Sequence, residues 1–116
     1  MKFETHNTND SIQINGTGLL AQLRHLSYDR IIDVLGEPTT HFDNYKCDAE
    51  WILQFEDGVV ATLYNYKNGQ NYCGPKAPHV TEITTWNIGG KDREAANRVH
   101  RLLAPQEPLS IYEHLV

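Results

Sequence analysis

Apolar residues recur at helical spacing in two segments of the chain, 27–36 and 91–103. In the first segment, one helical face would carry Tyr28, Ile31, Ile32 and Leu35. Ser27 suits the N-cap, Gly36 suits the position after the last turn, and Pro38 prevents continuation. In the second segment, the buried face would carry Ala95, Ala96, Val99, Leu102 and Leu103. We therefore predict two helices, and the small alanines should let the second lie close to a sheet.

Alternating apolar residues in 51–55 and 59–66 predict a pair of antiparallel strands. Between them, Asp57-Gly58 is the two-residue signal of a tight hairpin, which would place Trp51 opposite Tyr64. One face of the hairpin would then carry the core residues Trp51, Leu53, Phe55 and Val60. The other face would carry the mixed set Ile52, Gln54, Glu56, Ala61 and Leu63.

Residues 81–88 predict a third strand, with Trp86 and Ile88 on one face and Gly89-Gly90 at its end. Near the start of the chain, residues 11–14 alternate like a short strand. The following leucines would line one face of a short helix, namely Leu19, Leu20, Leu23 and Leu26. These elements predict an α+β fold for residues 1–116 as a single domain. It would be a two-layer sandwich, an antiparallel sheet of three to four strands packed on one face by two helices.

The C-terminal tail, residues 105–116, contains two prolines followed by a group of apolar residues. That group consists of Ile111, Tyr112, Leu115 and Val116. Such a segment would either dock on the sheet as an edge element or contact a partner, and the sequence leaves both possibilities open.

Residues 65–79, NYKNGQNYCGPKAPH, join the second and third predicted strands. They form either a loop of about fourteen residues or a hairpin that turns at Asn68-Gly69. Both arrangements concentrate the same residues, namely Tyr64, Asn65, Tyr66, Lys67, Asn71 and Tyr72. Tyrosine offers a large contact area at low entropic cost and asparagine offers adaptable hydrogen bonds, a combination typical of recognition surfaces. The alternative is that the tyrosines simply pack on the sheet.

The formal net charge of −5 is concentrated in the first half of the chain. Three of its acids, Asp29, Asp33 and Glu37, lie on or next to the first predicted helix. Because affinity for nucleic acid depends on Lys and Arg, direct binding to nucleic acid is not expected. An acidic surface suits a basic protein partner, although a solvated helix face would have the same composition.

The cysteines and histidines do not have the spacing of a metal site. Cys47 and Cys73 are not part of any close Cys or His pair of the kind that holds zinc, so no metal or cofactor is expected. We expect two free thiols. Cys73 and His79 are close enough in sequence to form a thiolate–imidazole pair, which leaves a small Cys/His enzyme as an alternative.

A second alternative comes from the turn into the last helix. Gly89, Gly90 and Lys91 precede Arg93 and Arg98, and free N–H groups at a helix start attract anions. An oligomer with this site would act as a sponge for a signalling nucleotide. The full phosphate-loop pattern is absent, however, and the acidic Asp92 and Glu94 lie in the same turn.

Three stretches, SYDRIIDVLGEP, AEWILQFEDGVVATLYNYK and TTWNIGGKDREAANRV, resemble a group of small uncharacterised proteins encoded by bacteriophages. The resemblance covers roughly residues 15–103 and rests on residues that shape the fold. It implies a non-enzymatic phage accessory protein that binds and blocks a host or antiviral-defence protein, as anti-CRISPR proteins do. Such a protein would act in the host cytoplasm, and a homodimer is compatible with this role.

Overall fold

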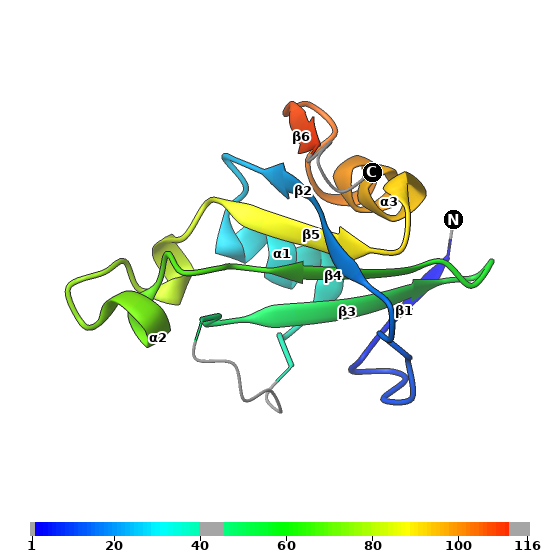
Figure 1. The fold of residues 1–116 in the computed structure, drawn as a ribbon, viewed down its shortest axis with the longest axis horizontal. Helices are drawn as coiled ribbons and strands as arrows, with labels where there is room; N and C mark the ends of the chain where they lie inside the picture. Colours follow the sequence, from blue (N-terminus) through cyan, green and yellow to red (C-terminus); the bar gives the residue numbers. More distant parts are fainter. Residues whose placement is uncertain (1, 40–45, 112–116) are drawn as a thin grey trace.

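The computed structural model describes residues 2–39 and 46–111, and within these ranges six strands form one antiparallel sheet (Figure 1). The strands are β1 (Phe3–Thr5), β2 (Gly18–Leu23), β3 (Glu50–Phe55), β4 (Val60–Tyr64), β5 (Trp86–Gly90) and β6 (Leu109–Ile111). The helices are α1 (Tyr28–Leu35), α2 (Gln70–Cys73) and α3 (Arg93–Leu103), with a 3-10 turn, η1 (Val80–Glu82). The strand order is β1-β3-β4-β5-β2-β6, and every neighbouring pair is antiparallel.

The predicted α+β class with an antiparallel sheet is confirmed, but the described residues form six strands and three helices rather than three to four strands and two helices. Two of the additional strands, β1 and β6, have three residues each, too few to show an alternating pattern. The additional helix, α2, is a single turn of four residues. Pairing with neighbouring strands therefore adds elements that local patterns do not reveal.

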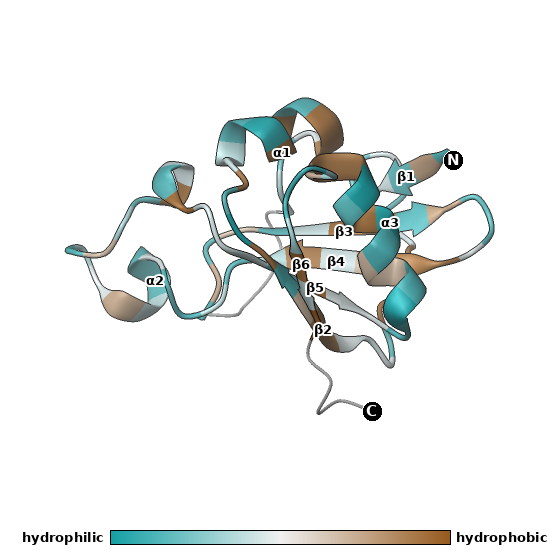
Figure 2. Cartoon of the chain, turned by 90° about the horizontal axis from the view of Figure 1, so that it is seen from above, coloured by the Kyte–Doolittle hydropathy of each residue, from teal (hydrophilic) through white to brown (hydrophobic). Residues whose placement is uncertain are grey.

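Both predicted helices form, and both pack on the same face of the sheet (Figure 2). The Ser27 hydroxyl accepts a hydrogen bond from the backbone N–H of Arg30, and Gly36 ends α1 with a φ of +81°. In α3, the small Ala95 packs against Gly90 of β5, where a side chain on the glycine would collide with it. The alanines thus bring α3 close to the sheet, as predicted.

Two tryptophans at the centre of the core attach α1 to the sheet. Trp51 and Trp86 are fully buried, and their rings meet edge to face with centroids 5.5 Å apart. The Trp86 indole N–H donates to the carbonyl of Leu26 at 2.9 Å, just before α1. The Trp51 indole N–H donates to the carbonyl of Gly36 at 2.8 Å, just after it. The two hydrogen bonds therefore hold α1 at both ends.

The hairpin between β3 and β4 has a different turn from the predicted one. The Phe55 N–H donates to the Val59 carbonyl at 2.8 Å, so the loop contains Glu56 and Asp57 followed by Gly58 with a φ of +92°. This is a three-residue loop with glycine in the left-handed position. Trp51 consequently lies opposite Leu63 and not Tyr64.

This one-residue difference reverses the faces of β4, because successive side chains of a strand point to opposite sides. Ala61 and Leu63 are fully buried on the core side, contrary to the prediction. Val60, Thr62 and Tyr64 point to the opposite face instead. The predicted core residues of β3, namely Trp51, Leu53 and Phe55, are confirmed.

The prediction of a short helix lined by Leu19, Leu20, Leu23 and Leu26 is wrong, because residues 18–23 form β2. This strand lies between β5 and β6, which supply hydrogen bonds on both of its edges. Tertiary pairing overrides a weak local helical pattern of this kind. The predicted strand at residues 11–14 is also absent, since that segment belongs to the connection between β1 and β2.

The third predicted strand is shifted towards the C-terminus. Residues 80–82 form η1, and β5 starts at Trp86 and continues through Gly89 and Gly90, which pair with both β2 and β4. The two glycines are therefore the last two residues of the strand and not a turn that follows it. Trp86 and Ile88 share the buried face, as predicted.

The first part of the C-terminal tail docks as an edge element, one of its two predicted placements. β6 pairs antiparallel with β2, and Ile111 lies opposite Ala21. Tyr112, Leu115 and Val116 of the predicted apolar group lie outside the described residues.

Candidate partner-binding site

The end of β4, the loop that follows it and the segment before β3 present an aromatic and basic surface, which we call the Tyr/Lys surface. It is formed by Lys46, Tyr64, Tyr66, Lys67 and Tyr72. Tyr66 and Tyr72 are 41% and 44% exposed, which is unusual for large aromatic side chains. The Lys67 ammonium lies 5.2 Å from the centroid of each of these two rings. Tyr64 meets Tyr66 edge to face at 6.5 Å. The structure therefore brings together the four Tyr and Lys residues that the sequence predicted at this site.

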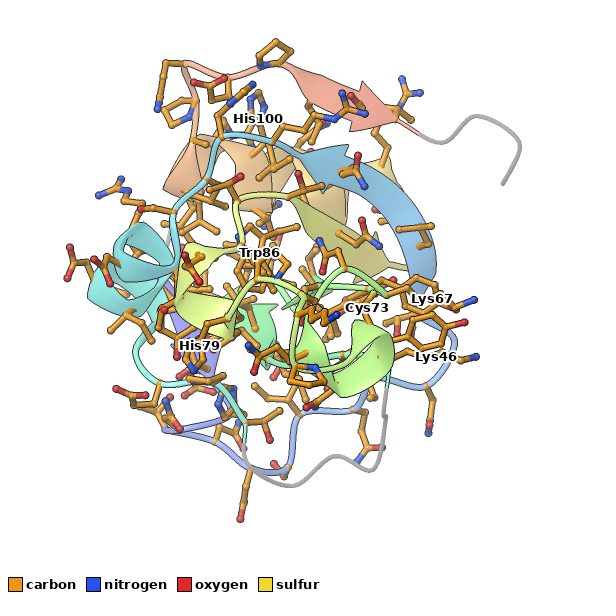
Figure 3. All side chains as sticks on the ribbon, turned by 90° about the vertical axis from the view of Figure 1, so that its left-hand side faces the viewer. Lys46, Lys67, Cys73, His79, Trp86 and His100 are labelled. Carbon is orange, nitrogen blue, oxygen red and sulfur yellow. The ribbon has the colours of Figure 1, made fainter. Side chains whose placement is uncertain are left out.

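Lys46 belongs to the same surface although the sequence did not indicate it. Its ammonium lies 6.0 Å from the centroid of the Tyr66 ring, and its carbonyl accepts a hydrogen bond from the Lys67 N–H at 2.8 Å. Figure 3 shows Lys46 and Lys67 on the same side of the molecule. Only the pairing of two segments far apart in sequence reveals this second lysine.

The loop contains one helical turn and no second hairpin. The alternative with a tight turn at Asn68-Gly69 is wrong, since Gly69 precedes α2, whose Cys73 N–H donates to the Gly69 carbonyl at 2.9 Å. Residues 65–79 are therefore a loop that carries a short helix and the 3-10 cap at His79.

Asn65, predicted as part of the recognition surface, is instead buried and anchors this loop to the segment before β3. Asn65 is fully buried, and its side-chain oxygen accepts hydrogen bonds from the backbone N–H groups of Asp48 at 2.7 Å and Ala49 at 3.0 Å. Its amide nitrogen donates to the Asp48 carboxylate at 2.8 Å and to the Asn68 side chain at 3.0 Å. All four hydrogen-bonding positions of the Asn65 amide are used, so the network specifies a single loop conformation.

Asp48 extends this network to α2. One of its carboxylate oxygens accepts a hydrogen bond from the Asn71 N–H at 3.2 Å, and the Asn71 side chain donates to the Cys47 carbonyl at 2.8 Å. The carboxylate also lies against Gly69, where any side chain would collide with it. Asn71, predicted as a contact residue, thus helps to hold the Tyr/Lys surface in place.

A pocket of about 240 Å³ lies beside the Tyr/Lys surface, on the sheet face opposite the helices. The connection from β1 to β2 runs past this face, because β3, β4 and β5 separate the two strands. Its residues Ile14 and Thr17 form one wall of the pocket. The other lining residues come from the strands and the loop, namely Gly18, Cys47, Glu50, Thr62, Tyr64, Tyr66 and Gly89. The sequence did not predict this pocket, since it depends on the register that turns Tyr64 away from the core.

Two ionisable groups of the pocket are perturbed by burial. Desolvation raises the pKa of the Glu50 carboxyl. Burial, with a smaller contribution from the nearby Glu50 and Asp48 carboxylates, raises the pKa of the Cys47 thiol to about 11. Cys47 is therefore a protonated thiol at neutral pH and is poorly suited to act as a nucleophile.

The acidic residues predicted as a second contact surface, Asp29, Asp33 and Glu37, are exposed on or next to α1. In Figure 3, α1 lies on the side of the molecule away from Lys46 and Lys67. The acidic helix and the Tyr/Lys surface are consequently separate surfaces and do not form one continuous patch.

Arg98, predicted as a ligand-binding residue, is paired with two carboxylates. Its guanidinium donates two hydrogen bonds to Asp57, at 2.7 and 3.0 Å, and one to Glu94 at 2.7 Å. It also lies over the Phe55 ring, 5.2 Å from the centroid. Arg98 therefore attaches the β3–β4 turn to α3.

Replacing Asp57 by asparagine is expected to remove the loss of stability at acidic pH that the Asp57–Arg98 ion pair causes. The hydrogen bonds from Arg98 hold the pKa of Asp57 at about 2, below its ordinary 3.8. Because the folded-state pKa is depressed, the stabilisation is complete above about pH 4 and is lost as the pH falls through about 2. The Tm difference between wild type and Asp57→Asn should therefore shrink over this range. The neighbouring exposed carboxylate serves as the control, since Glu56→Gln should show no such trend, and a pH-independent difference for Asp57→Asn would contradict the prediction.

The remaining members of the predicted nucleotide site are Gly89, Gly90, Lys91 and Arg93. The two glycines lie in β5 and are buried, whereas Lys91 and Arg93 are exposed where α3 begins. The glycine N–H groups belong to the sheet and not to a phosphate-binding turn. Lys91 therefore lies in the predicted strand-to-helix turn, but the two glycines belong to the strand before it.

Cys73 and His79 are also separate. The Cys73 thiol donates to the Lys67 carbonyl at 3.2 Å, whereas the His79 ring lies 2.9 Å from the Thr81 hydroxyl and caps η1. Figure 3 shows the two side chains well apart. Both cysteines are free, as predicted. Across residues 2–39 and 46–111, no group of three or more His, Cys, Asp or Glu side chains is placed to hold a metal ion.

No family model matches the chain, and neither a curated protein nor a solved structure matches it. The resemblance to phage-encoded proteins therefore stays a prediction. Among the helices in the described part of the chain, none has the length and apolar character needed to cross a membrane.

Proposed function

We propose that this protein is a non-enzymatic binding protein that attaches to a protein partner through the Tyr/Lys surface. The observation that supports this function best is the pair of exposed tyrosines, Tyr66 and Tyr72, with Lys67 between their rings. Tyrosine is enriched among the residues that contribute most to binding energy at protein interfaces. Exposed aromatic groups of this size favour a contact surface over solvent as their environment.

The rigidity of the loop supports the same function. Asn65 and Asp48 hold the segments that carry Lys46, Tyr66 and Tyr72 through a closed set of hydrogen bonds. A surface that is already ordered before binding loses less conformational entropy when a partner attaches. The tyrosines can therefore contribute their contact area without the cost of ordering a flexible loop.

The partner follows from the resemblance described above. A small phage-encoded protein with an exposed contact surface suits a role in which it binds and blocks a host or antiviral-defence protein, in the manner of anti-CRISPR proteins. The sponge alternative is weaker because Arg98, one of its cations, is paired with Asp57 and Glu94. The enzyme alternative is weaker because Cys73 and His79 are apart.

Removing both tyrosine rings is expected to abolish partner binding without unfolding the protein. Affinity capture from host cells with the wild-type chain identifies the partner, and titration then gives Kd for each variant. Tyr66→Ala/Tyr72→Ala should weaken binding on the order of a thousandfold, since residues at the centre of an interface contribute about 2 kcal/mol or more each. Its Tm should stay within a few degrees of wild type because both side chains are substantially exposed.

A matched double variant on the acidic helix, Asp29→Asn/Asp33→Asn, provides the control. Both residues are exposed and distant from the Tyr/Lys surface, so their replacement should leave Kd within about threefold of wild type. Undiminished binding by the tyrosine variant would contradict the proposed site. Loss of binding in the acidic variant alone would move the interface to α1.

A further inference from the structure

The pocket beside the Tyr/Lys surface contains a carboxylate with no bonding partner among the described residues. Glu50 is half-buried and lies directly opposite Tyr64 in the β3–β4 register. Its backbone carbonyl accepts a hydrogen bond from the Thr39 N–H, but its side chain has no hydrogen bond or ion pair within residues 2–39 and 46–111. A partly desolvated carboxylate of this kind gains most from a group that can donate hydrogen bonds to it.

The charge of the pocket favours a positively charged ligand. Of the lining residues that the structure describes, only Glu50 carries a charge at neutral pH, because burial keeps the Cys47 thiol protonated. Desolvation raises the pKa of Glu50, so its carboxylate form is short of stabilising contacts that a cation would supply. Next to the pocket, Asp48 and Lys46 act on Cys47 with opposite signs, so the unpaired charge is that of Glu50. Lys46 and Lys67 approach the Tyr66 ring but are not part of the lining.

The size and shape of the pocket limit the kinds of ligand that it can bind. A volume of about 240 Å³ is below the roughly 300–1,000 Å³ of ordinary small-molecule sites, so it suits one side-chain-sized group. Tyr64 supplies an aromatic wall, and its neighbour Tyr66 stands at 83° to it. Gly18 and Gly89 contribute no side chains, and a Cβ on Gly89 would collide with the Thr62 hydroxyl. A planar group fits against such a wall better than a round one.

We propose that this pocket binds an arginine side chain of the protein partner, with its guanidinium hydrogen-bonded to Glu50 and stacked on Tyr64. Guanidinium is planar, donates two parallel hydrogen bonds to a carboxylate and stacks on aromatic faces, whereas the lysine ammonium is a compact and strongly hydrated charge. The inference rests on the proposed function only for the origin of the arginine, since the pocket itself belongs to this chain.

The probe for this site is Nα-acetyl-arginine amide, titrated into the wild-type protein while the backbone amides of Gly18 and Gly89 are followed by NMR. Both amides should shift in a saturable way. Nα-acetyl-citrulline amide has nearly the same shape without the charge and should bind at least tenfold more weakly. The corresponding lysine amide should also bind more weakly, because it lacks the planar pair of donors.

Two variants connect the binding to Glu50. Glu50→Gln retains the size of the side chain and should weaken arginine amide binding about tenfold, because a charge-assisted hydrogen bond is replaced by a neutral one. Glu56→Gln, which removes an exposed carboxylate at the β3–β4 turn, should have no effect. Equal binding of the citrulline or lysine amide, unchanged affinity in Glu50→Gln, or no saturable shift at Gly18 and Gly89 would each overturn the proposal.

The outcomes separate this inference from the proposed function. If the arginine amide does not bind but Tyr66→Ala/Tyr72→Ala still abolishes partner capture, only the arginine site is wrong. If the amide binds as expected while the tyrosine variant captures its partner normally, the pocket stands and the Tyr/Lys surface is not the interface.

Discussion

Replacing Trp86 by alanine is expected to lower the free energy of unfolding by about 4 kcal/mol, within the range measured for large aromatic residues in protein cores. Trp86 is fully buried between the sheet and α1, and it contacts the rings of Trp51 and Tyr28. Its removal leaves a cavity and also leaves the Leu26 carbonyl without the indole N–H that donates to it at 2.9 Å. Urea unfolding followed by circular dichroism measures the change.

Two comparisons test the reason for this loss. Trp86→Phe keeps most of the apolar volume but not the hydrogen bond to Leu26, so it should cost about 2 kcal/mol, between wild type and Trp86→Ala. Tyr72→Ala, at a position that is 44% exposed, should change the unfolding free energy by less than about 1 kcal/mol. A loss from Trp86→Ala no larger than that from Tyr72→Ala would mean that the tryptophan pair does not hold α1 on the sheet.

Replacing Asn65 by alanine is expected to lower the free energy of unfolding by about 3 kcal/mol and to abolish partner binding. The effect on binding is indirect, because Asn65 is buried beneath the loop that carries Tyr66 and Tyr72. The substitution leaves the N–H groups of Asp48 and Ala49 without their acceptor, and each unpaired buried donor costs about 1–3 kcal/mol. It also releases the Asp48 carboxylate from the Asn65 amide. The loop should then lose its fixed conformation, so that Tyr66 and Tyr72 no longer hold their positions.

The control for this prediction is Asn7→Ala, which removes an asparagine hydrogen bond at an exposed position, from the Asn7 side chain to the Glu37 carbonyl at 2.9 Å. It should change the unfolding free energy by less than about 1 kcal/mol and leave partner binding intact. Urea unfolding and the Kd for the captured partner are measured on both variants. An Asn65→Ala protein with wild-type stability and affinity would show that the network is not needed to order the loop.

The candidate site was only partly predictable. Tyr64, Tyr66, Lys67 and Tyr72 are close in sequence, so their composition alone indicated a contact surface. Lys46 joins them because its carbonyl pairs with the Lys67 N–H, a contact between separate segments that no local pattern encodes. Glu50 directly precedes the predicted strand 51–55 and is the first residue of β3. Its place in a pocket depends on the β4 register.

That register illustrates the limit of local signals. Asp57-Gly58 indicated a turn correctly, but the same two residues suit a two-residue or a three-residue loop. The difference of one residue decides whether Leu63 or Tyr64 faces the core. Burial of Ala61 and Leu63 against the helices favours the observed three-residue loop. A two-residue loop would place the Tyr64 hydroxyl in an apolar core.

Local patterns were enough to predict α1, α3 and the buried face of β3, because helical periodicity, caps and strand alternation act between residues that are neighbours in the chain. Contacts between distant segments were needed to establish that residues 18–23 form a strand, that Gly89 and Gly90 belong to β5, and that Glu50 and Tyr64 share a pocket. These outcomes depend on pairing and burial between segments far apart in sequence, whose energies exceed the small local preferences.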